Sequence, residues 1–511
     1  MGKYLVAYDL GTNGVKAALF TPDGHQTAYC YQEYGVVYPN PSWVEQSIES
    51  MWAAQCEVTQ QLIHESGCSN RDIVAVAISS QRATFAPLDN SGSPLTDFIG
   101  WQDARSIEQC ELIKETIGSR RYYEIAGLPV SPTAAISKIL WIKENNPDLF
   151  ERTATFGTTQ SVHLHQLGVE NPPSDLADAG YMGLLDVDQL TWSSELLDEL
   201  GIPMEKMPRL ENSGECVGEV SVQAAAATGL AAGTPVVIAG GDLQCGGAGL
   251  GIVKPGTVSL GIGSGGGILI YLESPLRHPE IGLNCQPHVI KGGWEMEGIC
   301  LASGASFKWY RDVLSQIEKA SADQQGKDAY DLLNEAAAQS APGAGGLLFM
   351  PALAGSGAPH WYPQARGVLL GLTLATNKND INRAILEGIC LELRAMIEAA
   401  RQLGIQIDEL RIWGGAAKST FWNQIAANVY GVPAVKTAIR EAGLAGAAIC
   451  AGVGIGLYRD VSEGAENFVR VEERFEPDPK LRSRYDEMFD LYQTIYQTLK
   501  DSRAFERLSA L

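Results

Sequence analysis

Basic residues are scarce in this sequence. Lys and Arg number 38 against 60 Asp and Glu, which leaves a formal net charge of −22 at pH 7. A chain with this excess of negative charge is repelled by nucleic acid and by anionic membranes, so neither is expected as a main partner. Any anionic ligand must therefore be held by local geometry, because the field of the whole molecule works against it.

Long apolar runs, a leader segment and paired cysteines are missing as well. No apolar run approaches the length needed to span a bilayer, and Met1-Gly2-Lys3 leads directly into a strand with no signal-peptide hydrophobic region. The ten cysteines are scattered, with no C-x-x-C pair and no metal-ligand spacing. These absences predict a protein of the reduced cytoplasm without a membrane partner.

Apolar residues are plentiful enough to build more than one core. The 511 residues are 45% hydrophobic, which makes a two-domain protein the default. Periodicity predicts strands over residues 4–8, 15–20, 26–31 and 73–78, helices over 46–65, 106–117 and 136–144, and a loop over 171–179. The strand at 73–78 is apolar on both faces, as buried strands of mixed sheets are. This mixture of elements predicts an α/β fold and excludes an all-β protein.

The first two strands are joined by a turn suited to phosphate groups. Asp9 follows the apolar run, and Gly11-Thr12-Asn13-Gly14 comes next. Glycine permits positive φ and close backbone approach, so we expect the turn's N–H groups and the Thr12 hydroxyl to face phosphate oxygens. Asp9 would face Mg²⁺, and Lys16 would add positive charge. An ordinary hairpin with a glycine turn is the alternative reading.

The same pattern, an apolar strand that ends in a glycine-rich segment, recurs along the chain. A second apolar strand ends in Gly240-Gly241-Asp242, and a hairpin over residues 257–271 turns at Gly263 to Gly267. A later strand leads through residues 414–419 into a helix over 421–430, whose N-terminus could approach a nucleotide. Two hairpins in two halves predict a duplicated fold.

The ordered set of motifs resembles the FGGY carbohydrate kinase family, and the similarity runs end to end. The motifs that carry it are Asp9-Leu10-Gly11-Thr12-Asn13, Trp101-Gln102-Asp103-Ala104-Arg105, Gly241-Asp242, Pro351 to Gly355, Pro359-His360-Trp361, Ala365-Arg366-Gly367, Arg383 to Gly388 and Gly414 to Ser419. One segment departs from the family pattern, because Gly355-Ser356-Gly357-Ala358-Pro359 lacks the Glu-Arg pair that relatives commonly show.

This resemblance implies two ribonuclease-H-like domains of the actin and hexokinase type around an ATP cleft. The first domain, residues 1–251, would carry the sugar site, the first phosphate loop and the catalytic aspartate. The second domain, residues 252–511, would carry the second phosphate loop and the adenine site.

The family's catalytic aspartate falls on Asp242. A carboxylate at a strand end in the cleft can accept the proton of the attacking sugar hydroxyl. The implied metal site is Mg²⁺ at Asp9 and Asp242. The alternative is that either aspartate only caps a helix or a turn.

The implied cofactors are ATP and Mg²⁺, with nucleotide contacts divided between the domains. The residues assigned to ATP are Gly11, Thr12, Asn13, Lys16, Gly263, Ser264, Gly415, Ala416 and Ser419. The turn at Gly263 is unusually glycine-rich, and Ser264 stands where many relatives carry Thr, so we expect a more flexible loop.

The implied sugar site uses Gln81, Arg82, Trp101 and Asp103 together with Asp242. The polar side chains of Gln81, Arg82 and Asp103 can hydrogen-bond a row of hydroxyl groups, and the indole ring of Trp101 can pack against the carbon chain that carries them. The alternative makes Trp101 a core residue and Arg82 a surface salt-bridge partner.

The expected partner is a small sugar or polyol. Residues 81–84 match neither the xylulokinase nor the glycerol kinase pattern, while the second half is similar to the xylulokinase-like and quorum-signal-kinase branches. D-Xylulose is therefore the leading substrate, with glycerol, another ketose or polyol and a linear dihydroxyketone signal behind it. An actin-like or chaperone-like ATPase and a catalytically silent regulator are the alternatives from other classes. The sequence leaves a homodimer open.

Overall fold

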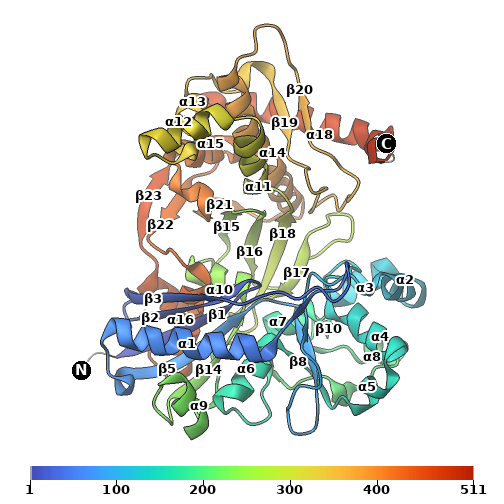
Figure 1. Cartoon of the computed structure of the whole chain (residues 1–511). Helices are drawn as coiled ribbons and strands as arrows, with labels where there is room; N and C mark the ends of the chain where they lie inside the picture. Colours follow the sequence, from blue (N-terminus) through green and yellow to red (C-terminus); the bar gives the residue numbers. More distant parts are fainter. Residues whose placement is uncertain (1–2, 510–511) are drawn as a thin grey trace.

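Two mixed β-sheets, one in each half of the chain, organise the structure (Figure 1). The computed structural model describes residues 3–509. The prediction that no signal peptide precedes the first strand involves Met1 and Gly2, which lie outside the described residues. No described helix is both long and apolar enough to cross a membrane.

The first sheet has the strand order β13-β14-β5-β1-β2-β3. Its strands are β1 (Tyr4–Leu10), β2 (Gly14–Phe20), β3 (Gln26–Glu33), β5 (Ile73–Ser80), β13 (Cys216–Glu219) and β14 (Pro235–Gly241). Strands β1, β2 and β3 form an antiparallel meander, and β5 and β14 join it in parallel. The predicted strands of this region are confirmed.

The second sheet repeats that plan within the order β17-β18-β16-β15-β21-β22-β23. Its strands are β15 (Gly256–Ile262), β16 (Gly266–Leu272), β17 (Asn284–Pro287), β18 (Trp294–Cys300), β21 (Ile407–Trp413), β22 (Ala434–Thr437) and β23 (Val471–Phe475). Here β15, β16 and β18 are the meander, and β21 and β22 are the parallel strands. The predicted duplication is therefore confirmed.

Helices cover both faces of the first sheet. Helix α1 (Ile48–Ser66) packs on β2 and β3, and α16 (Ala442–Gly454) packs on β1, β5 and β14. Ser47 caps α1 by accepting a hydrogen bond from the N–H of Ser50, and Gly67 ends the helix with φ 64°. Because α16 comes from the second half of the sequence, the chain crosses back to the first sheet after β22.

After this crossing, α16 packs against α10 (Asp242–Gly249). The two helices touch backbone to backbone, since a Cβ at Gly446 would lie 1.8 Å from the carbonyl oxygen of Cys245. A Cβ at Gly249 would lie 2.1 Å from the carbonyl oxygen of Ala442. Only glycine fits at these two positions, so the helix pair fixes α10 and its first residue, Asp242, against α16.

Further helices complete both halves. A helical cluster with its own core flanks the first sheet and contains α2 (Ile107–Thr116), α3 (Ser119–Ala126), α4 (Ala135–Asn145), α5 (Pro147–Arg152), α7 (Leu176–Tyr181) and α8 (Ser194–Leu200). The second half contains α11 (Gly304–Val313), α12 (Gln316–Gln325), α13 (Ala329–Ala338), α14 (Lys378–Gln402), α15 (Thr420–Tyr430), α17 (Val461–Phe468) and α18 (Arg482–Asp501). The ten cysteines are all free.

One expectation from the sequence is wrong, and one pair of glycines does not use the positive φ that glycine permits. The predicted loop over 171–179 contains the start of α7, because the Asp175 carboxylate caps that helix by accepting hydrogen bonds from the N–H groups of Ala177 and Asp178. Gly11 and Gly14 do not adopt positive φ. Gly14 is required by packing instead, since a Cβ there would lie 2.5 Å from the ring of Tyr31.

Candidate active site

Asp9 lies near the end of β1, at the edge where the two halves meet. Its side chain is 15% exposed, and its Oδ2 lies 3.8 Å from Nζ of Lys16. Lys16 donates a hydrogen bond of 2.8 Å to Oε2 of Glu441, the residue immediately before α16. A lysine thus stands between one carboxylate from each half of the sequence.

The surroundings of Asp9 are suited to a hard cation. Burial raises the pKa of Asp9 to about 7; Lys16 opposes this rise, and the charges of Asp242 and Glu441 add to it. Oδ1 of Asp9 is buried and has no hydrogen-bond partner among the described residues. The lack of a side chain at Gly443 keeps the space beside the Asp9 carboxylate open. A Cβ there would lie 3.5 Å from Oδ2 of Asp9 and 3.7 Å from the carbonyl oxygen of Asp242.

This donor set fits Mg²⁺ held jointly with substrate phosphates. Within residues 3–509, no group of three or more His, Cys, Asp or Glu side chains could hold a metal ion alone. Mg²⁺ is commonly held by one or two carboxylates, by water and by phosphate oxygens, which requires no such cluster. The predicted ligand role of Asp9 therefore has a free oxygen to support it.

Asp242 is the first residue of α10, directly after β14. Its side chain is 40% exposed, and its Oδ1 accepts a hydrogen bond of 2.8 Å from the N–H of Leu243. Nε of Arg82 lies 3.3 Å from the same Oδ1. Burial raises the pKa of Asp242, and Arg82 opposes the rise. The side chain thus stays partly open to solvent beside Arg82.

Arg82 follows β5 and reaches across to β18 of the second half. Its Nη1 and Nη2 donate hydrogen bonds of 2.7 and 3.2 Å to the two carboxylate oxygens of Glu297. The guanidinium carbon lies 3.7 Å from the ring centre of Tyr181, whose hydroxyl donates to Oε2 of Glu297. The side chain of Arg82 is only 9% exposed, so the alternative in which Arg82 forms a salt bridge at the surface is wrong.

The backbone next to Arg82 is strained. Ala83 has φ 58° although it carries a Cβ, and it is fully enclosed. Such a conformation persists only where the surroundings enforce it, and it is common at functional sites. Here it fixes the direction in which Arg82 leaves the end of β5.

Trp101 lies at the surface, beside Thr12. It is 37% exposed, so the reading of Trp101 as a core residue is wrong. Its Nε1 donates a hydrogen bond of 3.0 Å to Oγ1 of Thr12, and its backbone N–H donates to Oγ1 of Thr84. The Thr12 hydroxyl, predicted to face phosphate, thus contacts the aromatic wall of the predicted sugar site.

Gln81 and Asp103 are buried in hydrogen-bond networks. Nε2 of Gln81 donates to Oε1 of Gln46, while Oε1 of Gln81 is buried without a partner among the described residues. Both oxygens of Asp103 are taken by Arg105, and Oδ2 also accepts from the N–H of Val44. As placed, Gln81 keeps a free acceptor, whereas Asp103 has its acceptors filled from the protein.

The second-half nucleotide residues line one cavity of about 330 Å³. Gly263, Ser264, Gly415, Ala416 and Ser419 all face it. The turn after β15 is braced, since the Gly263 carbonyl oxygen accepts hydrogen bonds from Gly304 and Ser303. The other four residues assigned to ATP belong to the first half and lie beside Asp9. They are Gly11, Thr12, Asn13 and Lys16.

Four residues of this region were missed from the sequence. Glu297 and Tyr181 hold Arg82, and Glu441 holds Lys16. Asn334 lines the 330 Å³ cavity, and its buried Oδ1 has no hydrogen-bond partner among the described residues. A signal for Glu297 existed, because Glu295 and Glu297 alternate with apolar residues in one strand. Two buried acidic residues on one face of a strand require a cationic partner.

Comparison with known proteins covers most of the chain. The model of the N-terminal domain of the FGGY family of carbohydrate kinases matches residues 4–249, and the model of its C-terminal domain matches residues 259–455. A solved structure described as ligand-bound xylulose kinase from Lactobacillus acidophilus superposes with a TM-score of 0.90 at 25% identity over 98% of both chains. This similarity confirms the predicted pair of α/β domains of the actin and hexokinase type.

Two curated relatives match at equal identity. Xylulose kinase of Bacillus subtilis (strain 168) is 31% identical over 98% of both chains. Autoinducer-2 kinase of Escherichia coli (strain K12) is 31% identical over 97% of this chain and 94% of its own.

Proposed function

The chain belongs to the FGGY family of carbohydrate kinases, and on that premise we propose that it transfers the γ-phosphoryl group of ATP to a hydroxyl of a small neutral sugar or polyol. The observation that carries the proposal is the position of Asp242. Asp242 is the first residue of α10, its side chain is 40% exposed and therefore accessible to a ligand, and its Oδ1 lies 3.3 Å from Nε of Arg82. This is the arrangement that a general base for a sugar hydroxyl requires.

The proposed role of Asp242 is to accept the proton of the attacking hydroxyl. The hydroxyl oxygen forms a bond to the γ-phosphorus, the bond from that phosphorus to the β-bridging oxygen breaks, and ADP leaves. A carboxyl group whose pKa is raised by burial is a stronger base than a free one, which favours proton acceptance. Arg82 limits the rise and orients the carboxylate.

Mg²⁺, when bound, would neutralise charge on the phosphates, and Asp9 with Asp242 are the residues proposed to hold it. Lys16 lies 3.8 Å from Asp9 and adds a positive charge at the same edge. The first-half turn from Gly11 to Asn13 is proposed to contact the phosphates from that side.

The nucleotide is proposed to bind in the cavity at Gly263 and Gly415. Its volume of about 330 Å³ and its lining by Phe307, Tyr330 and Trp422 suit an aromatic base. The unpartnered Oδ1 of Asn334 supplies an acceptor for an amino group.

The charge around Arg82 supports a neutral acceptor. Glu297 occupies both terminal nitrogens of Arg82, and Asp242 faces its Nε. With its charge balanced twice, Arg82 has little left to attract a carboxylated sugar, whereas hydroxyl groups can donate to the surrounding oxygens. Trp101 offers a flat wall for the carbon chain.

D-Xylulose is the first proposed acceptor, and a linear dihydroxyketone signal is the second, because relatives named for xylulose and for autoinducer-2 match at 31% identity each. Glycerol and other ketoses follow. Domains at residues 1–251 and 252–511, a cytoplasmic location and a homodimer stay predictions.

The test is a coupled ADP-release screen with purified protein across pentuloses, polyols, hexoses, sugar acids and a linear dihydroxyketone. We expect release that depends on a neutral acceptor, with one acceptor exceeding the others in kcat/KM by at least tenfold. ADP release that is equal with and without every acceptor would contradict a sugar kinase.

A further inference from the structure

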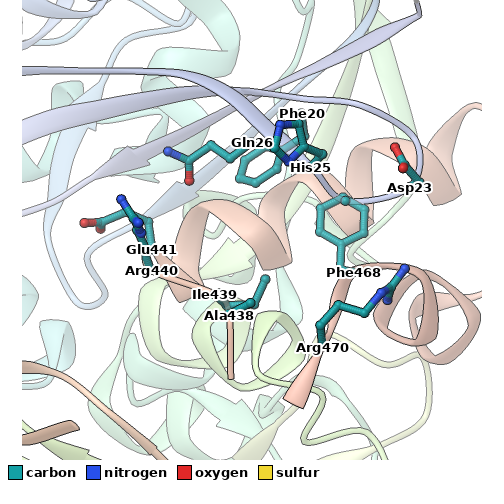
Figure 2. Close-up of a pocket in the computed structure, with 11 residues that line it drawn as sticks. Phe20, Asp23, His25, Gln26, Ala438, Ile439, Arg440, Glu441, Phe468 and Arg470 are labelled. Atoms are coloured by element: carbon teal, nitrogen blue, oxygen red, sulfur yellow. The ribbon is translucent and has the colours of Figure 1, made fainter. Parts of the chain in front are cut away.

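A pocket outside the active site lies where the chain crosses between the two halves. It has a volume of about 490 Å³, larger than the nucleotide cavity. Figure 2 shows its walls: His25 comes from the turn between β2 and β3, Gln26 from the start of β3, Ala438 and Ile439 from the link between β22 and α16, and Phe468 from the end of α17. We call it the hinge pocket.

Two of its walls are crossing segments. Residues 438–441 connect β22 of the second sheet to α16, which packs on the first sheet. Residues 469–470 lead from α17, which packs on α16, back to β23 of the second sheet. These links and residues 250–255, which join α10 to β15, connect the two sheets. An occupant of the hinge pocket would therefore touch two of the three segments that any movement between the sheets involves.

Two arginines bring positive charge to the hinge pocket. Arg440 is exposed and has no ion pair or hydrogen bond within the described residues. Arg470 uses Nη1 on the carbonyl oxygens of Glu466 and Val469 and leaves its other nitrogens unpaired. His25 adds a third nitrogen-bearing side chain.

Of the two acidic residues of the hinge pocket, Glu441 is balanced by a lysine, whereas Asp23 is bonded to a neutral hydroxyl and keeps its charge. Asp23 accepts a hydrogen bond from the hydroxyl of Thr21, and Glu441 accepts one from Lys16. A guanidinium without a partner among the described residues, such as that of Arg440, is suited to carboxylate or phosphate oxygens. The remaining nitrogens of Arg470 add donors from a second segment, which favours the larger charge of a phosphate.

The remaining walls are apolar. The rings of Phe20 and Phe468 lie 5.5 Å apart, and Ile439 completes this side. A bare phosphate ion would leave these walls without a contact, whereas a phosphate carrying a short carbon skeleton would cover them.

We propose that the hinge pocket binds a small organic phosphate and thereby regulates the active site. Glu441 lines the pocket and holds Lys16, which lies 3.8 Å from Asp9. A phosphate beside Arg440 would repel the carboxylate of Glu441 and disturb its hold on Lys16. The ligand site and the proposed metal site thus share one ion pair.

The test is calorimetric titration of the full chain with D-ribose 5-phosphate, inorganic phosphate and D-ribose. We expect saturable binding of D-ribose 5-phosphate, at least tenfold weaker binding of inorganic phosphate and none of D-ribose. Arg440→Gln should weaken the binding at least tenfold, and Ala438→Trp, which fills the pocket, should abolish it. Arg459→Gln, which removes a guanidinium that is 80% exposed and lies outside the pocket, should leave it unchanged.

Absent binding, or binding that Arg440→Gln and Ala438→Trp leave intact, would overturn the site. Equal affinity for inorganic phosphate would overturn the organic class of the ligand. The calorimetric titration measures binding alone, so its outcome does not depend on the proposed reaction. Regulation is tested by ADP release with the acceptor found in the screen: D-ribose 5-phosphate should change the rate at least twofold in the wild type and not in Arg440→Gln. Binding without a change in rate would overturn the regulatory role.

Discussion

At the scale of single residues, Arg82 links the proposed base to the second half of the molecule. It is held by Glu297 and Tyr181 and lies 3.3 Å from Asp242. Glu295, next to Glu297 on the same face of β18, has its pKa raised well above the usual range by burial and by the charge of Glu297. Glu297 bonds both terminal nitrogens of Arg82 and Asp242 lies beside its Nε, so Glu297 is the second-half carboxylate that contributes most to the charge balance of the sugar site.

Glu297→Gln should change the acceptor preference toward sugar acids. Without that carboxylate, the terminal nitrogens of Arg82 lose their charged partner, so less of its positive charge is balanced and a carboxylated sugar is attracted more strongly. We expect the ratio of kcat/KM for D-gluconate to that for D-xylulose to rise at least tenfold in a coupled ADP-release assay. Tyr181→Phe is the matched control, because it removes a hydrogen bond to Glu297 and leaves the ion pair; its ratio should stay near wild type. An unchanged ratio in Glu297→Gln would refute this account of the charge balance.

Lys138 is a second residue-scale feature with a measurable effect. It is fully buried in α4 and donates hydrogen bonds to the carbonyl oxygens of Gly100, Trp101 and Thr133, which braces the segment that carries Trp101. Burial lowers the pKa of Lys138 from 10.5 to about 7, and the nearby Asp103 opposes that shift.

The stability of the wild type relative to Lys138→Met should therefore depend on pH. Between pH 7 and pH 10 the unfolded chain keeps the Lys138 proton and the folded chain does not, so the unfolding free energy rises with pH. The difference between the two proteins should grow by about 1.4 kcal/mol per pH unit in urea unfolding. Lys143→Met, on the same helix but only half-buried, is the control and should show no such slope. Parallel curves for Lys138→Met and the wild type would show that Lys138 keeps its proton on folding.

At the scale of elements, the pair of helices α10 and α16 determines where Asp242 stands. The pair packs through glycines, and its geometry allows a matched test. A Cβ at Gly446 would lie 1.8 Å from a backbone oxygen, whereas a Cβ at Gly246 would meet only the Cβ of Ala442 at 4.0 Å.

Gly446→Ala should lower the thermal midpoint sharply, with a loss of about 3 kcal/mol or more, because the helices must separate. Gly246→Ala should leave the midpoint at or above that of the wild type, since alanine favours helix by about 1 kcal/mol. Equal midpoints for the two variants would contradict the close contact of α10 with α16.

The sequence predicts these elements unevenly. Apolar runs such as residues 73–78 and the paired turns are local signals, so the strands and the duplication followed from them. The start of α7 was missed because its signal is one capping carboxylate, Asp175, inside a Pro/Asp-rich stretch. The partners of Arg82 were missed because Tyr181 and Glu297 lie 99 and 215 positions away, and only the folded chain brings them together.

At the scale of the whole molecule, the residues assigned to ATP lie in two halves joined by the crossing segments (Figure 1). Transfer to a sugar rather than to water requires that the halves approach each other around the substrates.

Small-angle scattering should therefore show a radius of gyration that falls when the preferred sugar is added. A sugar that supports no ADP release is the control and should leave the radius unchanged. An unchanged radius with the preferred sugar, together with brisk sugar-independent ATP hydrolysis, would favour an actin-like ATPase.

The most direct test of the central claim is the rate of phosphoryl transfer from labelled ATP to the preferred sugar in a single turnover, measured for the wild type and for Asp242→Asn. The amide keeps the size of the side chain and cannot accept the proton. We predict a rate lower by about 10²–10⁴-fold with ATP affinity changed no more than a few-fold. A variant that retains most of the wild-type rate would contradict the assignment of Asp242 as the base and, with it, the proposed mechanism.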